Sequence, residues 1–120
     1  MKTNNWIESF RHAINGIRST ARRERNFRIH IFFAFFAVAA CIVFRVEAIH
    51  FIMVGFSIFF VMGMELVNTA VEALVDMYCR GKQHPLAKLA KDAAAGAVLL
   101  ASIQAVIVGA WVAISVIRAN

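Results

Sequence analysis

Residues 93–117, AAAGAVLLASIQAVIVGAWVAISVI, form the longest apolar stretch of the chain and contain no charged side chain. A helix needs roughly 20 predominantly apolar residues to cross the hydrocarbon core of a bilayer. This stretch, extended to about residues 87–117, is therefore predicted to span a membrane. Its small residues, among them Gly96 and Gly109, are of the kind that lets transmembrane helices approach each other closely.

Two earlier stretches predict two more spans. Residues 28–46 are rich in phenylalanine and are bounded by Arg28 and Arg45, whose long side chains can reach the membrane surface. Residues 48–76 begin apolar and then keep a helical period as polar side chains appear. Pro85, in the polar connector that follows, is well placed to begin the next helix. We therefore expect an all-α integral membrane protein with three transmembrane helices, in one domain over residues 1–120.

The composition of the 120-residue chain supports this fold class. Apolar residues make up 61% of the chain and charged residues 17%, whereas soluble domains average about 45–50% and 25%. The six Gly and single Pro leave little room for a βαβ nucleotide-binding domain, and the sequence has no glycine-rich phosphate loop or zinc motif. The polar N-terminal stretch is too long for a cleavable signal, and Cys41 and Cys79 are not expected to form a disulfide.

A further helix is predicted before the first span, over about residues 5–25. At 100° per residue its apolar side chains fall on one side, with arginines beside them. Such a helix, with a tryptophan in its apolar side, is typical of a membrane surface. We expect an N-terminal amphipathic surface helix, and the alternative is a helix packed on a soluble partner. Its apolar residues are Trp6, Ile7, Phe10, Ile14 and Ile17.

The positive charges are distributed unevenly along the chain. Of the 13 Lys and Arg residues, seven precede the first span and four lie in or beside the connector between spans two and three. Only Arg45 and Arg118 remain for the other side. Because Lys and Arg favour the cytoplasmic side, the N-terminus is predicted inside and the C-terminus outside. The net charge of +6 then reflects topology and anionic lipids, and no nucleic-acid partner is expected.

The end of the second span carries a stripe of polar residues. Counted from His50 at the outer edge, the stripe begins roughly 22 Å into a core about 30 Å thick, just inside the cytoplasmic boundary. Carboxylates at that depth need cations or water, because burying them unpaired is unfavourable. The members lie at positions i, i+3, i+4, i+7 and i+11, on one side of a helix: Glu65, Asn68, Thr69, Glu72 and Asp76.

Three more charged residues are expected at the same level, namely Glu24 before span one and Lys91 and Asp92 before span three. With the stripe they would suit Mg²⁺ and a polyphosphate, since Mg²⁺ prefers carboxylate and phosphate oxygens and lysine offsets phosphate charge. A carboxylate free of metal could take a proton from an attacking hydroxyl. The alternative is that these residues pair across helices, such as Glu24 with an arginine or Asp92 with Lys88. Because three helices can hardly surround five carboxylates, we expect a homo-oligomer with sites between subunits.

Two other functions are compatible with carboxylates in a membrane. A proton-coupled transporter would use such a group, although these carboxylates gather near one face rather than at the midplane. A scaffold without turnover would leave the stripe unexplained. The histidines are not expected to bind a ligand as a pair. His30 and His50 lie at span ends, His12 lies on the surface helix, and His84 before Pro85 is interpreted as structural.

The stripe and its neighbours resemble a known family. Residues 65–76, ELVNTAVEALVD, are followed by residues 84–98, HPLAKLAKDAAAGAV, and preceded by Gly16-Ile-Arg18 and by residues 24–28, ERNFR. Over nearly the whole chain the sequence is similar to the small integral-membrane lipid kinases of bacteria, the prokaryotic diacylglycerol kinase family, which includes the undecaprenol kinases. The resemblance implies a homotrimer in the bacterial cytoplasmic membrane, with active sites shared between neighbouring subunits. It also implies MgATP as phosphoryl donor and a lipid alcohol as acceptor.

The resemblance further implies roles for individual residues. Glu65 would be the general base that acts on the lipid hydroxyl, with Asn68 beside it. Glu24 and Glu72 would bind Mg²⁺. An arginine of the surface helix joins the site in some relatives, and here Asn5 stands at that place while Arg11 is the nearest candidate. The residues predicted to bind ATP are Lys91 at the phosphates, Asp76 and Asp92 at the nucleoside end, Arg11, and Gly16.

The acceptor is also suggested by resemblance. Residues 25–30, RNFRIH, and residues 84–88, HPLAK, are more similar to the undecaprenol kinases of Gram-positive bacteria than to the diacylglycerol kinases of Gram-negative bacteria. The resemblance therefore favours undecaprenol as acceptor, with undecaprenyl phosphate as product. Diacylglycerol, which would give phosphatidic acid, is the alternative.

Overall fold

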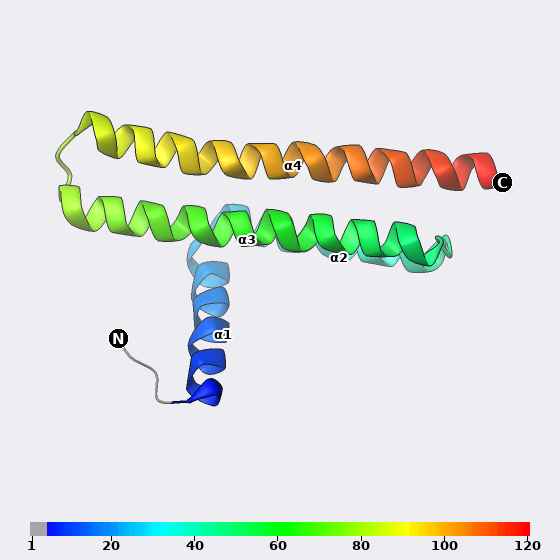
Figure 1. Ribbon diagram of the computed structural model, residues 1–120, viewed down its shortest axis with the longest axis horizontal. Coiled ribbons are helices and arrows are strands. Elements are labelled where there is room, and N and C mark those ends of the chain that lie inside the picture. The colour runs from blue at the N-terminus through cyan, green and yellow to red at the C-terminus, as the bar shows by residue number, and fades with distance from the viewer. Residues whose placement is uncertain (1–4) are drawn as a thin grey trace.

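The computed structural model describes residues 5–120, which form four α-helices and no strand: α1 (Trp6–Arg23), α2 (Arg25–Val43), α3 (Ala48–Cys79) and α4 (Pro85–Ala119). Helices α2, α3 and α4 run alongside one another as an elongated bundle, and α1 projects sideways from it (Figure 1). Helix α3 packs along α4 and also against α2. The all-helical fold class predicted from the sequence is confirmed.

Three of these helices are long and apolar enough to cross a membrane, with 19 residues in α2, 32 in α3 and 35 in α4. The three predicted spans are therefore confirmed as helices of spanning length. At 1.5 Å per residue α2 is about 28 Å long and α3 about 48 Å. Helix α2 matches the thickness of a bilayer core, whereas α3 and α4 are long enough to extend well beyond it.

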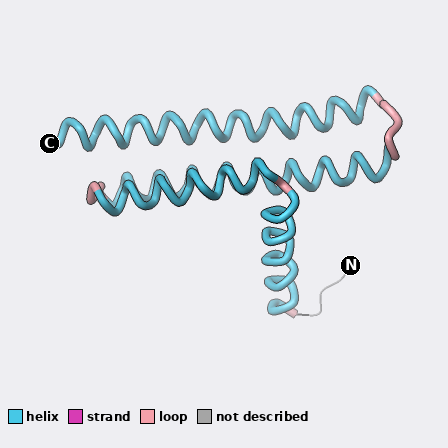
Figure 2. Tube along the Cα trace, turned by 180° about the vertical axis from the view of Figure 1, so that it is seen from behind, coloured by secondary structure: helices cyan, strands magenta, loops and turns pink. Residues whose placement is uncertain are grey.

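The break between α1 and α2 lies at Glu24, whose backbone is extended. Arg28 stabilises this corner, because its Nη1 donates hydrogen bonds to the carbonyl oxygens of Ala21 and Arg22, each at 3.0 Å, at the end of α1. Such carbonyls have no partner inside the helix, so an arginine is favourable there. Figure 2 shows the corner as a short loop from which α1 turns away from the bundle.

The connector between α3 and α4 is defined by its backbone and by a cap. Arg80 and Gly81 have positive φ angles of 49° and 82°, a conformation that ends helices and that glycine adopts without strain. The His84 side chain accepts a hydrogen bond from the backbone N–H of Leu86 at 3.1 Å, and Pro85 is the first residue of α4. His84 thus has the structural role expected of it.

The buried core of the chain is thin. Cys41, Val54 and Val112 form its main apolar cluster, with one residue from each of the three long helices. Many large apolar side chains are exposed, among them Phe35 on α2 and Phe59 on α3. Soluble monomers rarely expose continuous apolar surface of this extent. Lipid or neighbouring chains must therefore cover these helices. Both cysteines are free.

Candidate active site

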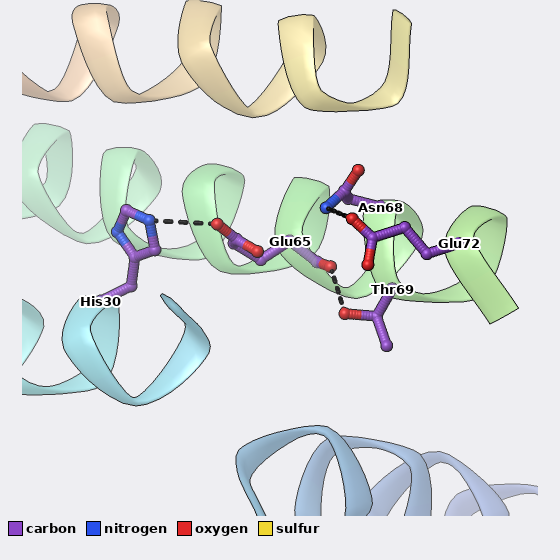
Figure 3. Close-up of polar contacts among 5 residues, drawn as sticks. All are labelled: His30, Glu65, Asn68, Thr69 and Glu72. Atoms are coloured by element: carbon purple, nitrogen blue, oxygen red, sulfur yellow. Dashed lines mark hydrogen bonds and ion pairs between the residues drawn. The ribbon is translucent and has the colours of Figure 1, made fainter. Parts of the chain in front are cut away.

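Glu65 is the most deeply buried carboxylate among the described residues, with 4% of the residue exposed. Its Oε1 lies 3.2 Å from Nε2 of His30, which reaches it from α2 (Figure 3). Burying a carboxylate is unfavourable unless it is hydrogen-bonded, and Nε2–H of the imidazole is the partner that α2 supplies. His30 is itself partly exposed, at 26% of its side chain.

The pairing of α2 with α3 explains how these two residues meet. His30 is five residues beyond the start of α2 at Arg25, or about 7 Å along the helix. Glu65 lies opposite it in α3, so the contact sits close to the end of α2 at which α1 joins it. Fourteen residues of α3 follow Glu65, and they carry the helix about 21 Å further toward the connector.

The next polar residues of α3 are held by one another. Nδ2 of Asn68 donates a hydrogen bond to Oε1 of Glu72 at 3.2 Å (Figure 3). Because Nδ2 of Asn68 is bonded to Glu72, Oδ1 points away from Glu72. This oxygen is buried without a partner in the part of the chain that the structure describes. The Thr69 hydroxyl donates to the backbone oxygen of Glu65 at 3.0 Å. Thr69 therefore belongs to the helix rather than to the site.

The connector end of the stripe contains ion pairs at the surface. Nζ of Lys91 on α4 lies 2.6 Å from Oδ1 of Asp76 on α3 and joins the ends of these two helices. Lys88 pairs with Asp92 one turn along α4. The pairing of Asp92 with Lys88 is the alternative that the sequence left open. All four of these side chains are more than a third exposed.

A hollow of about 690 Å³ lies beside these ion pairs. It is bounded by the ends of α3 and α4 and by the connector, and three lysines and two aspartates line it. The lysines could bind a phosphate group that enters from solvent, because ion pairs at a surface are weak and a lysine can exchange one anionic partner for another. The charged residues of the lining are Asp76, Lys82, Lys88, Lys91 and Asp92.

Three of the predicted site residues lie on α1 or at its end rather than on α3 or α4. Glu24 is half-buried at the corner of α1 and α2. Arg11 is exposed on α1, and Gly16 accepts a hydrogen bond from the Thr20 hydroxyl at 2.8 Å through its backbone oxygen. Over residues 5–120 no hydrogen bond or ion pair connects Glu24, Arg11 or Gly16 to α3 or α4. Asn5 caps α1, because its Oδ1 accepts a hydrogen bond from the Glu8 N–H at 2.8 Å.

The candidate metal ligands Glu24 and Glu72 are likewise not part of a preformed metal cage. Among the described residues there is no group of three or more His, Cys, Asp or Glu side chains that could hold a metal ion. Mg²⁺ usually binds through one or two carboxylates and completes its coordination with phosphate oxygens and water. The half-buried Glu72 carboxylate, held by Asn68, fits a site of that kind.

An apolar groove of about 670 Å³ begins at His30 and runs between α2, α3 and α4 to the opposite end of the bundle. Neither the groove nor the contact of His30 with Glu65 was predicted from the sequence. Counting depth along both spans could have put His30 level with Glu65, but only the packing of the helices forms the groove. Residues of its lining include His30 and Cys41 from α2, Val54 and Val61 from α3, and Val108 and Ile117 from α4.

Curated relatives and a family model match this chain. Of three relatives, the diacylglycerol kinase of Synechocystis sp. is 46% identical over 105 residues, which are 88% of this chain and 60% of the relative. The undecaprenol kinase of Bacillus subtilis is 45% identical over 112 residues, covering 88% of this chain and 85% of the relative. The diacylglycerol kinase of Haemophilus influenzae is 30% identical over 95 residues, covering 79% and 80%. The family model for prokaryotic diacylglycerol kinase matches residues 11–113. The chain belongs to the prokaryotic diacylglycerol kinase family, a family of lipid kinases.

Proposed function

We propose that this chain is an ATP-dependent lipid kinase, which transfers the γ-phosphoryl group of ATP to a lipid hydroxyl at the cytoplasmic face of a bacterial membrane. The observation that carries the proposal is the buried Glu65 beside the start of an apolar groove, in a chain of this family. A groove of that kind would hold the lipid chain and present its hydroxyl next to a carboxylate.

Glu65 is the proposed general base. Its Oε1 accepts from His30, so Oε2 is the atom that would take the hydroxyl proton. As that O–H bond breaks, the lipid oxygen attacks the γ-phosphorus, the bond from phosphorus to the bridging oxygen breaks, and ADP leaves. Asn68, whose Oδ1 is buried and without a partner in residues 5–120, is the proposed second catalytic residue beside Glu65.

MgATP would bind between Glu65 and the connector that joins α3 to α4. Glu72 and Glu24 are the proposed Mg²⁺ ligands, and the metal ion would neutralise negative charge on the phosphate oxygens. Lys91 would exchange its contact with Asp76 for a phosphate contact. The further residues proposed for the nucleotide are Asp76 and Asp92 at the nucleoside end, with Arg11 and Gly16 from α1.

We further propose a homotrimer with active sites shared between subunits. Within residues 5–120 of one chain, Arg11, Gly16 and Glu24 make no hydrogen bond or ion pair with the α3 carboxylates, so a neighbouring subunit could complete the site. The exposed apolar side chains of the long helices support such an assembly. We also propose that α1 lies on the cytoplasmic membrane surface, where its exposed Trp6 and Phe10 would enter the lipid. The N-terminus would be inside and the C-terminus outside.

Undecaprenol is the favoured acceptor and diacylglycerol is the second candidate. The relative from Bacillus subtilis is named for the first substrate and the relative from Synechocystis sp. for the second, at nearly equal identity. The motifs RNFRIH and HPLAK favour undecaprenol.

The test is an assay of detergent-solubilised protein with γ-labelled ATP and parallel undecaprenol and diacylglycerol. We expect label in undecaprenyl phosphate above label in phosphatidic acid. The reverse preference would assign the alternative acceptor. Label in neither lipid, together with proton flux in liposomes without ATP, would replace the kinase by a transporter.

A further inference from the structure

His30 contacts the carboxylate that the proposed function uses as a base, yet that function gives His30 no role. Its Nε2 lies 3.2 Å from Oε1 of Glu65, across the interface of α2 and α3. Among the described residues, Glu65 has no other side-chain hydrogen bond or ion pair. The orientation of this buried carboxylate therefore depends on a single contact from a neighbouring helix.

The side from which His30 reaches Glu65 decides what it can do. In Figure 3 the Glu65 carboxylate lies between His30 on one side and the pair of Asn68 and Glu72 on the other. Glu72 is a proposed Mg²⁺ ligand, so the γ-phosphoryl group would approach from its side. His30 lies on the opposite side of the Glu65 carboxylate from that approach.

We infer that His30 is a positioning residue for Glu65: its Nε2–H holds Oε1, so that Oε2 faces the lipid hydroxyl and the γ-phosphoryl group. This inference rests on the proposed function and adds a residue to it. The imidazole can donate from Nε2 whether the ring is neutral or protonated, so the role does not depend on its charge. His30 also lines the start of the apolar groove, which places the oriented carboxylate beside the lipid.

A positioning role predicts a specific kinetic change. Without the donor, Glu65 can rotate about its side-chain bonds, and a misplacement of about 1 Å in a reacting group can lower the rate about 100-fold. His30→Ala is expected to lower kcat by about 10- to 100-fold on this basis. Because His30 does not contact nucleotide in this scheme, the KM for MgATP is expected to stay within about threefold of the wild-type value.

Two conservative variants separate orientation from folding. In His30→Gln the amide nitrogen is the same number of bonds from the backbone as Nε2, so it can still donate to Glu65. In His30→Asn the amide is one bond too short. Both variants are polar and neutral at the same site. We expect His30→Gln to keep kcat within about fivefold of wild type and His30→Asn to resemble His30→Ala.

The experiment measures kcat and both KM values for full-length wild type and variants, in micelles that contain the lipid that wild type phosphorylates. His50→Ala is the matched control, because His50 lies at the other end of α3, where its ring contacts Trp111 and, within residues 5–120, its side chain makes no hydrogen bond or ion pair. A double-mutant cycle adds Glu65→Asp, whose carboxylate is withdrawn by one methylene. In the Glu65→Asp background, His30→Ala should then lower kcat much less than in the wild-type background, because the contact between the two side chains is already lost.

Several results would overturn the inference. They are a fully active His30→Ala, equal kcat values for His30→Gln and His30→Asn, or additive effects in the cycle with Glu65→Asp. A wild-type protein that phosphorylates neither lipid overturns the proposed function itself, and the two failures are thereby distinguishable.

Discussion

The two ends of the polar stripe on α3 hold their carboxylates in different ways. Glu65 is buried and accepts from His30 of a neighbouring helix. Asp76, eleven residues along, is 66% exposed and pairs with Lys91 at the surface. A carboxylate is thus held in one orientation at the buried end, whereas at the exposed end it can exchange its ion-pair partner.

This difference indicates how the work of a kinase could be divided. A hydrogen bond to a charged group is worth about 1.5–3 kcal/mol, and leaving a buried charge without its partner is more unfavourable still. Ion pairs between exposed side chains contribute about 0–1 kcal/mol. The buried end is therefore suited to hold a base in one orientation. The exposed end is suited to release its lysines to phosphate when nucleotide arrives.

The largest expected effect comes from neutralising the buried end. Glu65→Gln removes the proposed base and should lower kcat by about 10²–10⁴-fold, the usual contribution of general-base catalysis. Its stability should not fall, because an uncharged amide is easier to bury than a carboxylate. Steady-state kinetics and thermal unfolding in detergent measure both effects. Glu47→Gln, at the other end of α3, is the control and should keep wild-type kcat. Full activity in Glu65→Gln would remove Glu65 from the chemistry.

A smaller effect is expected at the exposed end. Lys91→Ala removes a cation proposed to contact ATP phosphates, and should raise the KM for MgATP by about tenfold with a smaller change in kcat. Titration of MgATP at saturating lipid measures this change. An unchanged KM with a much lower kcat would instead place Lys91 at the reacting phosphate, and the division between the two ends would need revision.

A modest effect on stability is expected away from both ends. Nε2 of Gln104 on α4 donates to the Ser57 hydroxyl on α3 at 3.1 Å, within the apolar part of the bundle. Hydrogen bonds between transmembrane helices contribute about 0.6 kcal/mol on average and at most about 1.7 kcal/mol. Gln104→Leu should lower the free energy of unfolding in detergent by such an amount and leave kcat unchanged. Ser115→Ala is the control. A loss of activity in Gln104→Leu would show that the spans transmit packing changes to the site.

The smallest effect is expected for Lys88→Ala. Lys88 pairs with Asp92 on the same helix, and both side chains are largely exposed. Exposed pairs at this spacing stabilise a helix by a few tenths of a kcal/mol. The melting temperature and kcat should stay close to wild type, and the KM for MgATP should change less than in Lys91→Ala. A larger rise in KM than in Lys91→Ala would make Lys88 the main phosphate contact.

The sequence predicted the helices well because their signal is local. Residues 93–117 contain no charge, and α4 contains them all. The stripe was found by the same periodicity, which assigns side chains to one face of one helix. Thr69 was included for that reason, although its hydroxyl is bonded to the backbone of Glu65. Periodicity predicts which face of a helix a side chain lies on. It does not predict whether that side chain is already hydrogen-bonded within the helix.

Contacts between helices were harder to predict. The meeting of His30 with Glu65 depends on how far α2 is shifted along α3, and the apolar groove depends on three helices at once. Neither follows from the pattern of a single span. The pair of Lys88 and Asp92 could be anticipated because it lies within one helix. Lys91 with Asp76 could not, because the connector determines how α3 and α4 are aligned.

The proposal that the buried end of the stripe holds the base and the exposed end binds phosphate is tested most directly by equilibrium binding. The measurement compares the binding of MgATP to Glu65→Gln and to Lys91→Ala, in micelles without a lipid acceptor. Calorimetry gives Kd without requiring turnover. We predict that Glu65→Gln binds MgATP with the wild-type Kd and that Lys91→Ala binds about tenfold more weakly. Wild-type binding by Lys91→Ala together with weakened binding by Glu65→Gln would contradict the account.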